Sequence, residues 1–428
     1  MCTLKAKYRI AITGTPVHNS LNDLYSLVKF LHFTPLDDFG LWKYLFSTES
    51  ISKSLSKENS IEREKRLGVW LKFLSDFLIL RRTKKDKFQG TNKCIVDLPE
   101  KQIEEVRFKL NESESVIYQK IFKESQDKVN KFLDDQQNRL IGITSGKMSR
   151  KNVSEIFVYL LRLRQACCHM SLLAECLDKA ELENHQFETS PDEPQDSFKS
   201  SCYNDEIQFD SDSNDSVRTN DLESVKNISN ENLSNCLKKS YMSSKIDKSL
   251  SMIIDLLNEY PEDKIIVVSQ WTSVLTIIGN NLKKRDISFC EIKGDVMLAK
   301  RNEIVETFND KANVDLRVML LSLTAGGVGL NLIGANRMFL LDIHWNPALE
   351  QQCADRIYRV GQTKNVTVYK MLCEETIEER IQQIQQAKIQ IAERVCRSGP
   401  ESAIPGVPAN ARLTIKDFKL LFKDFDTK

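Results

Sequence analysis

The sequence lacks features that would assign it to several common classes. No apolar run reaches the roughly 20 residues that a membrane-spanning helix needs, and residues 1–7 contain no apolar core of a signal peptide. Neither sign of charge dominates, because 61 lysines and arginines stand against 60 aspartates and glutamates. We therefore expect a soluble protein whose contacts with nucleic acid are confined to local patches.

The 11 cysteines lack the C-x-x-C spacing of a zinc or redox motif. This scatter favours reduced thiols over a disulfide framework and predicts a cytosolic or nuclear protein. Cys167 and Cys168 precede His169, a cluster compatible with a metal site or with a packed helix. Because no second group of ligands follows, we favour the helix and expect no metal site.

What is present, between residues 245 and 395, is a regular alternation of strands and helices. Apolar strands are expected at residues 264–269, 288–292, 318–323, 338–343 and 366–372, and amphipathic helices at 272–284, 299–309, 347–359 and 375–395. This order predicts an α/β fold, with a parallel sheet covered by helices on both faces. Ligands of such sheets bind at the carboxyl ends of the strands.

The preceding residues are less regular. Residues 8–13 read as a buried strand that runs into a turn, and residues 61–83 and 111–174 have helical patterns. The basic cluster at residues 81–85 is compatible with contact to a DNA backbone and equally with a solvated surface. Residues 175–244 are rich in Ser, Asn, Asp and Glu, which predicts a disordered insert. It is either a simple linker or a segment regulated by phosphorylation.

Two segments carry the candidate chemistry. The turn Thr-Ala-Gly-Gly-Val-Gly-Leu-Asn at residues 324–331 follows a strand, where backbone amides can approach phosphate, although a tight strand-to-helix connection has the same pattern. Further along, Asp-Arg-Ile-Tyr-Arg-Val-Gly-Gln at residues 355–362 places Arg356 and Arg359 on one face of the expected helix. Guanidinium groups suit the spread negative charge of a phosphoryl-transfer transition state. We therefore favour paired catalytic arginines over a surface salt bridge.

With these segments the sequence resembles the Swi/Snf-type ATPases of helicase superfamily two. The matching motifs follow the family's order and lie at residues 12–19, 80–84, 98–101, 268–272, 293–295 with Arg301, and 340–347. The resemblance implies a RecA-like second motor lobe at residues 245–395. It also implies a C-terminal remnant of a first RecA-like lobe with a helical protrusion at 1–110, a helical linker at 111–174, the insert at 175–244 and a tail at 396–428.

The resemblance also implies roles for individual residues, with ATP and Mg²⁺ as cofactors and double-stranded DNA as partner. Arg356 and Arg359 would complete the ATP site, and Gln352, Gly329 and Asp355 would position or sense the nucleotide. Contact with DNA, or coupling to it, is implied for Thr13, Gly14, Thr15, Ser322, Gly326, Gly327, Gln270 and Trp271. A place in the core is the alternative for Trp271, and for Trp345 as well.

Residues 160–173 and 413–422 resemble the branch of this family that acts in transcription termination. That likeness implies a nuclear ATPase that translocates on DNA and releases RNA polymerase II with its transcript. A chromatin remodeller would share the same motifs. A non-catalytic short form that binds DNA or a protein partner is a third alternative.

The sequence departs from the family in one respect. It has neither the phosphate-binding loop G-x-x-x-x-G-K-[ST] nor the Asp-Glu-x-His that serves magnesium and the attacking water. The nearest string, at residues 142–148, is one residue short between its glycines and has Met in place of the hydroxyl. We therefore expect an N-terminally truncated chain that is inactive by itself. Cys176, Cys202 and Cys236 are too sparse for the zinc domain that some relatives carry in the insert.

Overall fold

The computed structural model describes residues 5–13, 21–46, 69–140, 150–173, 235–294, 296–326, 329–396 and 415–423, without residues 71, 75, 81, 85 and 89. The chain divides into two compact units. Unit 1 comprises residues 1–97, 346–348 and 383–417, and unit 2 comprises residues 98–345, 349–382 and 418–428. Gly14, Thr15, Gly327 and most of the predicted insert lie outside the described residues. No helix in the described ranges is long and apolar enough to cross a membrane.

Unit 2 contains a six-stranded parallel sheet. Its strands are β1 Lys101–Phe108, β2 Ile265–Ser269, β3 Phe289–Ile292, β4 Val318–Ser322, β5 Arg337–Leu340 and β6 Val366–Cys373. They are arranged in the order β1-β6-β5-β2-β4-β3, and every neighbouring pair is parallel. The prediction of an α/β fold with a parallel sheet is confirmed.

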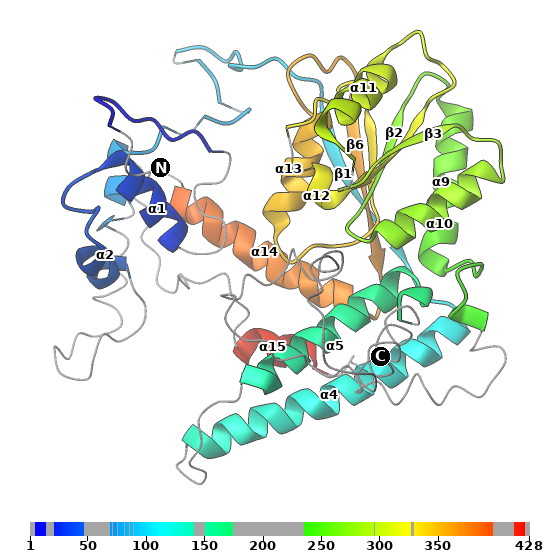
Figure 1. Ribbon diagram of the computed structural model, residues 1–428, viewed down its shortest axis with the longest axis horizontal. Coiled ribbons are helices and arrows are strands. Elements are labelled where there is room, and N and C mark those ends of the chain that lie inside the picture. The colour runs from blue at the N-terminus through cyan, green and yellow to red at the C-terminus, as the bar shows by residue number, and fades with distance from the viewer. Residues whose placement is uncertain are drawn as a thin grey trace, which may run out of the picture. The chain divides into compact units, whose positions relative to one another are not determined.

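Helices cover both faces of this sheet (Figure 1). One face packs against α9 Ser244–Glu259 and α10 Thr272–Lys283, and the other against α11 Leu298–Asn309, α12 Leu323–Gly326 and α13 Pro347–Ile357. Strand β2 shows the reason: Ile265 and Val267 enter one core, while Ile266 and Val268 enter the other. Because all four side chains are buried, the strand reads as a continuous β-branched run.

The edge strand β1 corrects the sequence-based boundary at residue 110. We expected residues 1–110 to belong with a first lobe, yet β1 pairs with β6 from Lys101↔Val366 to Phe108↔Cys373. Most of its residues are exposed or half-buried, and charged side chains interrupt its apolar pattern. Edge strands commonly carry such charges, which hid this strand from periodicity.

The helical segment of unit 2 consists of α4 Glu112–Leu140 and α5 Arg150–Cys168, which pack side by side (Figure 1). Both helices lie in the range for which the sequence predicted helix. The hydroxyl of Tyr118 accepts a hydrogen bond of 2.7 Å from the backbone N–H of Ile377, at the start of α14 Ile377–Cys396. Near the end of α15 Ile415–Leu421, Phe422 stacks on Phe122 with a centroid separation of 6.0 Å. These contacts attach the C-terminal residues to the helical segment.

Residues 235–244 are ordered, which shortens the predicted insert. Ser243 is buried, its hydroxyl donates to the carbonyl of Cys168 at 2.9 Å, and it accepts from the N–H of Ile246 at the start of α9. Because serine is a strong N-cap residue, the segment is anchored in the fold before α9 begins.

In unit 1, α1 Leu21–Leu31 and α2 Phe39–Phe46 enclose a small core around Trp42 and Leu74. The prediction of a buried strand at residues 8–13 is wrong for this structure. Ile12 is 95% exposed, and no strand pairs with residues 8–13 in the described part of the chain. A strand is stable only beside a hydrogen-bonded neighbour, so an apolar run alone does not produce one.

Candidate functional site

Hydrogen bonds between its own residues hold the glycine-containing turn after β4. The hydroxyl of Ser322 accepts from the N–H of Ala325 at 3.2 Å and lies 3.3 Å from the hydroxyl of Thr324. A Cβ added to Gly326 would come within 2.8 Å of the sulfur of Cys353 in α13. Ser322 and Gly326 are therefore buried parts of the turn, whereas Gly329 is exposed, with nothing within 4 Å of an added Cβ.

A direct hydrogen bond joins this turn to the arginine segment. The Nε of Arg356 donates to the carbonyl oxygen of Gly326 at 3.0 Å. Arg356 is half-buried, while Arg359 is exposed. The structure therefore brings together the two segments that the sequence singled out, and leaves Arg359 accessible to a ligand.

The two arginines do not share a helical face, which corrects the predicted helix over residues 347–359. Helix α13 ends at Ile357, and Gly361 has a positive φ of 103°. The side-chain amide of Gln362 donates to the carbonyls of Ile357 and Ala335 at 3.1 and 2.7 Å, and its oxygen accepts from the N–H of Lys364 at 3.0 Å. Gln362 thus satisfies a carbonyl at the end of the helix, which stops before Arg359.

Helix α13 presents polar side chains on the side that it does not bury. Cys353, Ala354 and Ile357 face the core. Gln352 and Asp355 are half-buried, and the Asp355 carboxylate accepts a hydrogen bond of 3.1 Å from Gln351. The candidates Gln352, Asp355 and Arg356 therefore belong to one short helix whose position is fixed by its apolar side.

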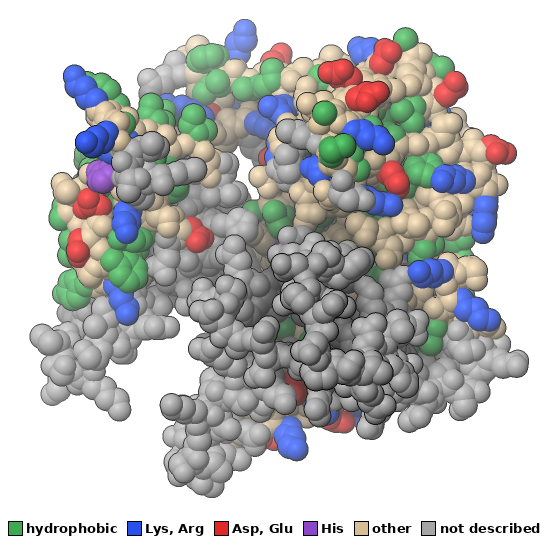
Figure 2. Space-filling model, viewed as in Figure 1, with side chains coloured by type: hydrophobic (Ala, Val, Ile, Leu, Met, Phe, Trp, Pro, Cys, Tyr) green, Lys and Arg blue, Asp and Glu red, His purple; other side chains and the backbone are tan. Residues whose placement is uncertain are grey.

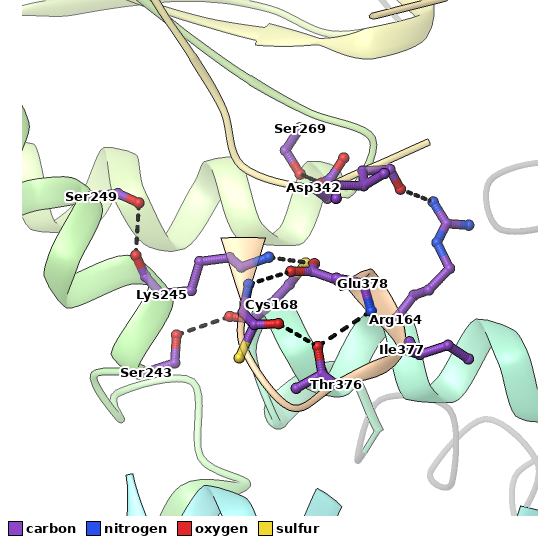
Figure 3. A network of polar contacts seen from close by, with 12 residues as sticks. Arg164, Cys168, Ser243, Lys245, Ser249, Ser269, Asp342, Thr376, Ile377 and Glu378 are labelled. Carbon is purple, nitrogen blue, oxygen red and sulfur yellow. Dashed lines mark hydrogen bonds and ion pairs between the residues drawn. The ribbon is translucent and has the colours of Figure 1, made fainter. Parts of the chain in front are cut away.

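A second group of candidates lies at the carboxyl ends of β2 and β5. The carboxylate of Asp342 accepts a hydrogen bond from the hydroxyl of Ser269, and another from the N–H of Gln270 at 3.1 Å (Figure 3). Burial raises the pKa of Asp342 to about 6, although the bonds from Ser269 and Gln270 lower it and the charges of Lys245 and Arg164 do so as well. The sequence motif contained Asp342, but sequence reasoning gave this residue no role.

Trp271 begins helix α10 beside this carboxylate. Its N–H donates to the hydroxyl of Ser269 at 3.0 Å, and its ring is half-buried against the core that α9 and α10 cover. Trp271 therefore lies partly in the core, which was the second interpretation of this residue. The side-chain Nε2 of Gln270 and the indole Nε1 of Trp271 are buried, and neither has a hydrogen-bond partner among the described residues.

Beneath these residues lies a buried ion pair. The ammonium of Lys245 is 2.5 Å from the carboxylate of Glu378, and both side chains are almost fully buried (Figure 3). Burial acts to lower the pKa of Lys245, but the charges of Glu378 and of the neighbouring cysteines together outweigh burial, and the net pKa is raised. Glu378 also accepts from the N–H of Cys373 at 2.9 Å. This pair joins α9 to α14.

The Cys167–Cys168–His169 cluster packs as a helix end. The N–H of Ser171 donates to Nδ1 of His169, so the protonated Nε2 donates to the carbonyl of Tyr241 at 2.9 Å. Burial raises the pKa of both thiols well above the ordinary value. Both imidazole nitrogens are thus already engaged. Among the described residues, no group of three or more His, Cys, Asp or Glu could hold a metal ion.

The remaining candidate, Thr13, is exposed in unit 1. On the face of the molecule shown in Figure 2, lysine and arginine side chains are interspersed with acidic ones. This mixture matches the formal net charge of +1.

Comparisons with known proteins agree with these motifs. Residues 1–172 match the SNF2-related domain, and residues 248–361 match the helicase conserved C-terminal domain. Transcription termination factor 2 of Drosophila melanogaster is 34% identical over 99% of this chain and 42% of its own length. Helicase-like transcription factor of Mus musculus is 30% identical over 91% of this chain and 40% of its own length. The chain therefore spans about two fifths of the relatives that it matches.

A solved structure, the Sulfolobus solfataricus SWI2/SNF2 ATPase core in complex with double-stranded DNA, is 26% identical, with a TM-score of 0.45, over 99% of this chain and 68% of that one. The matched domains cover both the first 172 residues and the sheet that carries the arginine segment. The chain belongs to the Swi/Snf family of helicase-like ATPases.

Proposed function

We propose that this chain supplies the second motor lobe of a DNA-dependent ATPase that moves along double-stranded DNA. The observation that carries the proposal is the hydrogen bond from Arg356 to the carbonyl of Gly326, at 3.0 Å. It ties the arginine segment to the glycine turn that follows β4.

In this proposal Arg359 reaches the phosphates of ATP and stabilises the charge that develops during hydrolysis. Arg356 donates to the carbonyl of Gly326, which keeps the glycine turn beside α13, and adds its positive charge to the site. Gln352, Asp355 and Gly329 are half-buried or exposed, which suits residues that sense the nucleotide.

The proposal places the phosphate-binding loop and the magnesium ligands on another lobe. The sequence contains no G-x-x-x-x-G-K-[ST] or Asp-Glu-x-His, and the described residues offer no cluster for a metal ion. Mg²⁺ would neutralise phosphate charge when it is bound with ATP. This chain would contribute arginines to the site, and we propose that it does not hydrolyse ATP by itself.

Contact with DNA is proposed for a second group of residues. Gln270 and Trp271 have buried donors without a partner, and such donors destabilise a fold by about 1–3 kcal/mol each unless a ligand satisfies them. Phosphate oxygens of DNA would accept these hydrogen bonds. We also propose that a further group of residues contacts DNA or couples ATP hydrolysis to it: Thr13, Gly14, Thr15, Ser322, Gly326 and Gly327. Ser322 and Gly326 would act through the shape of their turn.

For the cellular role, we propose release of RNA polymerase II and its transcript from DNA in the nucleus. The support is the likeness to a transcription termination factor over 99% of the chain. A chromatin remodeller is the second candidate, since the motifs are shared. A non-catalytic module that binds DNA or a partner is the third.

The deciding experiment presents two substrates to a motor that combines this chain with a phosphate-binding lobe. Stalled polymerase complexes and positioned nucleosomes are incubated with the motor and ATP, and released transcript and shifted nucleosomes are measured. The Arg359→Ala motor is the control for dependence on hydrolysis. Transcript release without nucleosome movement supports termination. Nucleosome movement alone would instead establish remodelling.

A further inference from the structure

Arg164 of α5 is a buried arginine beside both tryptophans of the sheet's carboxyl edge. It is 2% exposed, and its guanidinium carbon lies 5.9 Å from the ring centroid of Trp271 and 5.3 Å from that of Trp345. Its Nη2 donates to the carbonyl of Ile343 at 2.8 Å, as Figure 3 shows. One side chain therefore contacts the start of α10 and the loop that follows β5.

Burying an arginine is costly, so its surroundings must compensate for the lost hydration. Here the compensation comes from the Ile343 carbonyl, from the faces of the two indoles and from the nearby charge of Asp342. A planar guanidinium can donate in its plane and stack on rings at the same time, which a lysine ammonium cannot do. The contacts at this position therefore call for arginine specifically.

Asp342 holds the part of the chain that leads into Trp271. It binds the hydroxyl of Ser269 and the N–H of Gln270, the residues directly before Trp271. The chain entering α10 is thus held by Asp342 on its backbone and by Arg164 at its indole. The loop of residues 341–345 carries both Asp342 and Trp345, so the two tryptophans are fixed relative to each other through one loop and one arginine.

We propose that Arg164 is a positioning residue that orients Trp271 and Trp345 for duplex DNA and so links the α4–α5 helical segment to the DNA-binding edge of the lobe. The proposal rests on the proposed function insofar as it names DNA as the ligand of this edge. The orientation of the indoles is a property of the chain by itself.

The test uses the 428-residue chain with Trp42→Phe and Trp70→Phe, so that Trp271 and Trp345 are its remaining tryptophans. Arg164→Met removes the guanidinium while keeping an unbranched side chain, and Arg164→Lys keeps the charge without the planar group. Arg162→Gln is the matched control, because Arg162 is a buried arginine of the same helix that hydrogen bonds to Gln165 at 2.9 Å. Circular dichroism verifies that each variant is folded.

The first readout is tryptophan emission and its quenching by acrylamide, without DNA. We expect Arg164→Met to shift the emission maximum and increase quenching, Arg164→Lys to show a smaller change, and Arg162→Gln to match the parent. If Arg164→Met does not fold, Arg164→Lys carries the same test. Emission and quenching equal to the parent in a folded Arg164 variant overturn the proposal, whatever happens with DNA.

The second readout is the affinity for a fluorescent duplex, measured by anisotropy. Arg164→Met should bind roughly tenfold more weakly, which corresponds to the loss of one cation–π and hydrogen-bond contact. In a Trp271→Phe/Trp345→Phe background the same substitution should change affinity less than twofold, because its effect passes through the indoles. An equal loss in both backgrounds overturns the positioning role. A parent that does not bind duplex contradicts the proposed function, and the emission result then decides the orientation of the indoles alone.

Discussion

The two ends of the parallel sheet differ in the groups that surround a buried carboxylate. At the amino end, Asp263 pairs with Arg337 at 2.7 Å and with Lys364 at 3.0 Å, and Arg317 donates to the carbonyls of Asp263 and Leu257. At the carboxyl end, Gln270 and Trp271 have buried donors without a partner among the described residues.

The carboxylates at these two ends also titrate in opposite directions. Burial acts to raise the pKa of Asp263, but hydrogen bonds from Asn336, Arg337 and Lys364 lower it below its ordinary value. For Asp342, burial prevails and the pKa rises to about 6. Hydrogen bonds to the ionised Asp263 stabilise the fold, whereas unpaired donors and an under-compensated carboxylate lower stability and leave groups available to a ligand. The difference leaves the donors of Gln270 and Trp271, at the carboxyl end, available to a ligand.

The largest expected effect is on catalysis. Arg359→Ala, in a motor that joins this chain to a phosphate-binding lobe, should lower DNA-stimulated ATP turnover by ~10³-fold, because an arginine that stabilises the transition state contributes about that factor. DNA affinity and thermal stability should change little, since the side chain is exposed. Lys364→Ala, at the amino end, is the control and should retain turnover. Near-normal turnover in Arg359→Ala would remove this arginine from the mechanism.

At the amino end, Asp263→Ala should lower the free energy of unfolding by about 3 kcal/mol, because it leaves two buried or half-buried cations without their carboxylate. Urea unfolding of the chain measures this change. Asp255→Ala, at an exposed position of α9, is the control. A loss no larger than that of the control would show that the network does not stabilise the sheet.

The raised pKa of Asp342 predicts that stability depends on pH with the opposite sign from the dependence that Asp263 produces. Since its folded pKa, about 6, exceeds its unfolded value, the folded state binds the proton more tightly, and its contribution to stability falls as pH rises from about 5 to 7. Asp342→Asn should remove about 1 kcal/mol of this dependence while keeping an acceptor for Ser269. Urea unfolding at pH 5 and pH 7 compares the variant with the parent. Equal pH dependence in both proteins contradicts the raised pKa.

The smallest effect is expected for Lys364→Ala. Its side chain is 40% exposed, so solvent screens its pairing with Asp263 and the loss should stay below about 1 kcal/mol. Comparing its unfolding at low and high salt separates the charge effect from packing. A loss as large as that of Asp263→Ala would mean that Lys364, rather than Arg337, is the main partner of the carboxylate.

The sheet of unit 2 was largely predictable, because its central strands are buried on both faces and read as apolar runs of matching length. Strand β1 was not, since charged residues interrupt its pattern. The strand predicted at residues 8–13 needed neighbouring strands, and none of the described residues pairs with it.

Within the candidate site, the sequence proposed residues but not their geometry. The order of motifs identified Arg356 and Arg359, but the end of α13 depends on Gln362 reaching back to Ile357, a contact that no pattern in the sequence shows. Arg164 lies far along the chain from Ile343, Trp271 and Trp345. Only the fold brings these residues together, so sequence reasoning assigned Arg164 no role.

The central claim is that the arginine segment of residues 355–362 forms half of an ATPase site. Its most direct test is ATP hydrolysis by the purified 428-residue chain, with and without duplex DNA, compared with the same chain joined to a lobe that carries G-x-x-x-x-G-K-[ST]. We predict no hydrolysis above background for the chain alone and DNA-stimulated hydrolysis, abolished by Arg359→Ala, for the joined protein. DNA-stimulated hydrolysis by the chain alone would contradict the account.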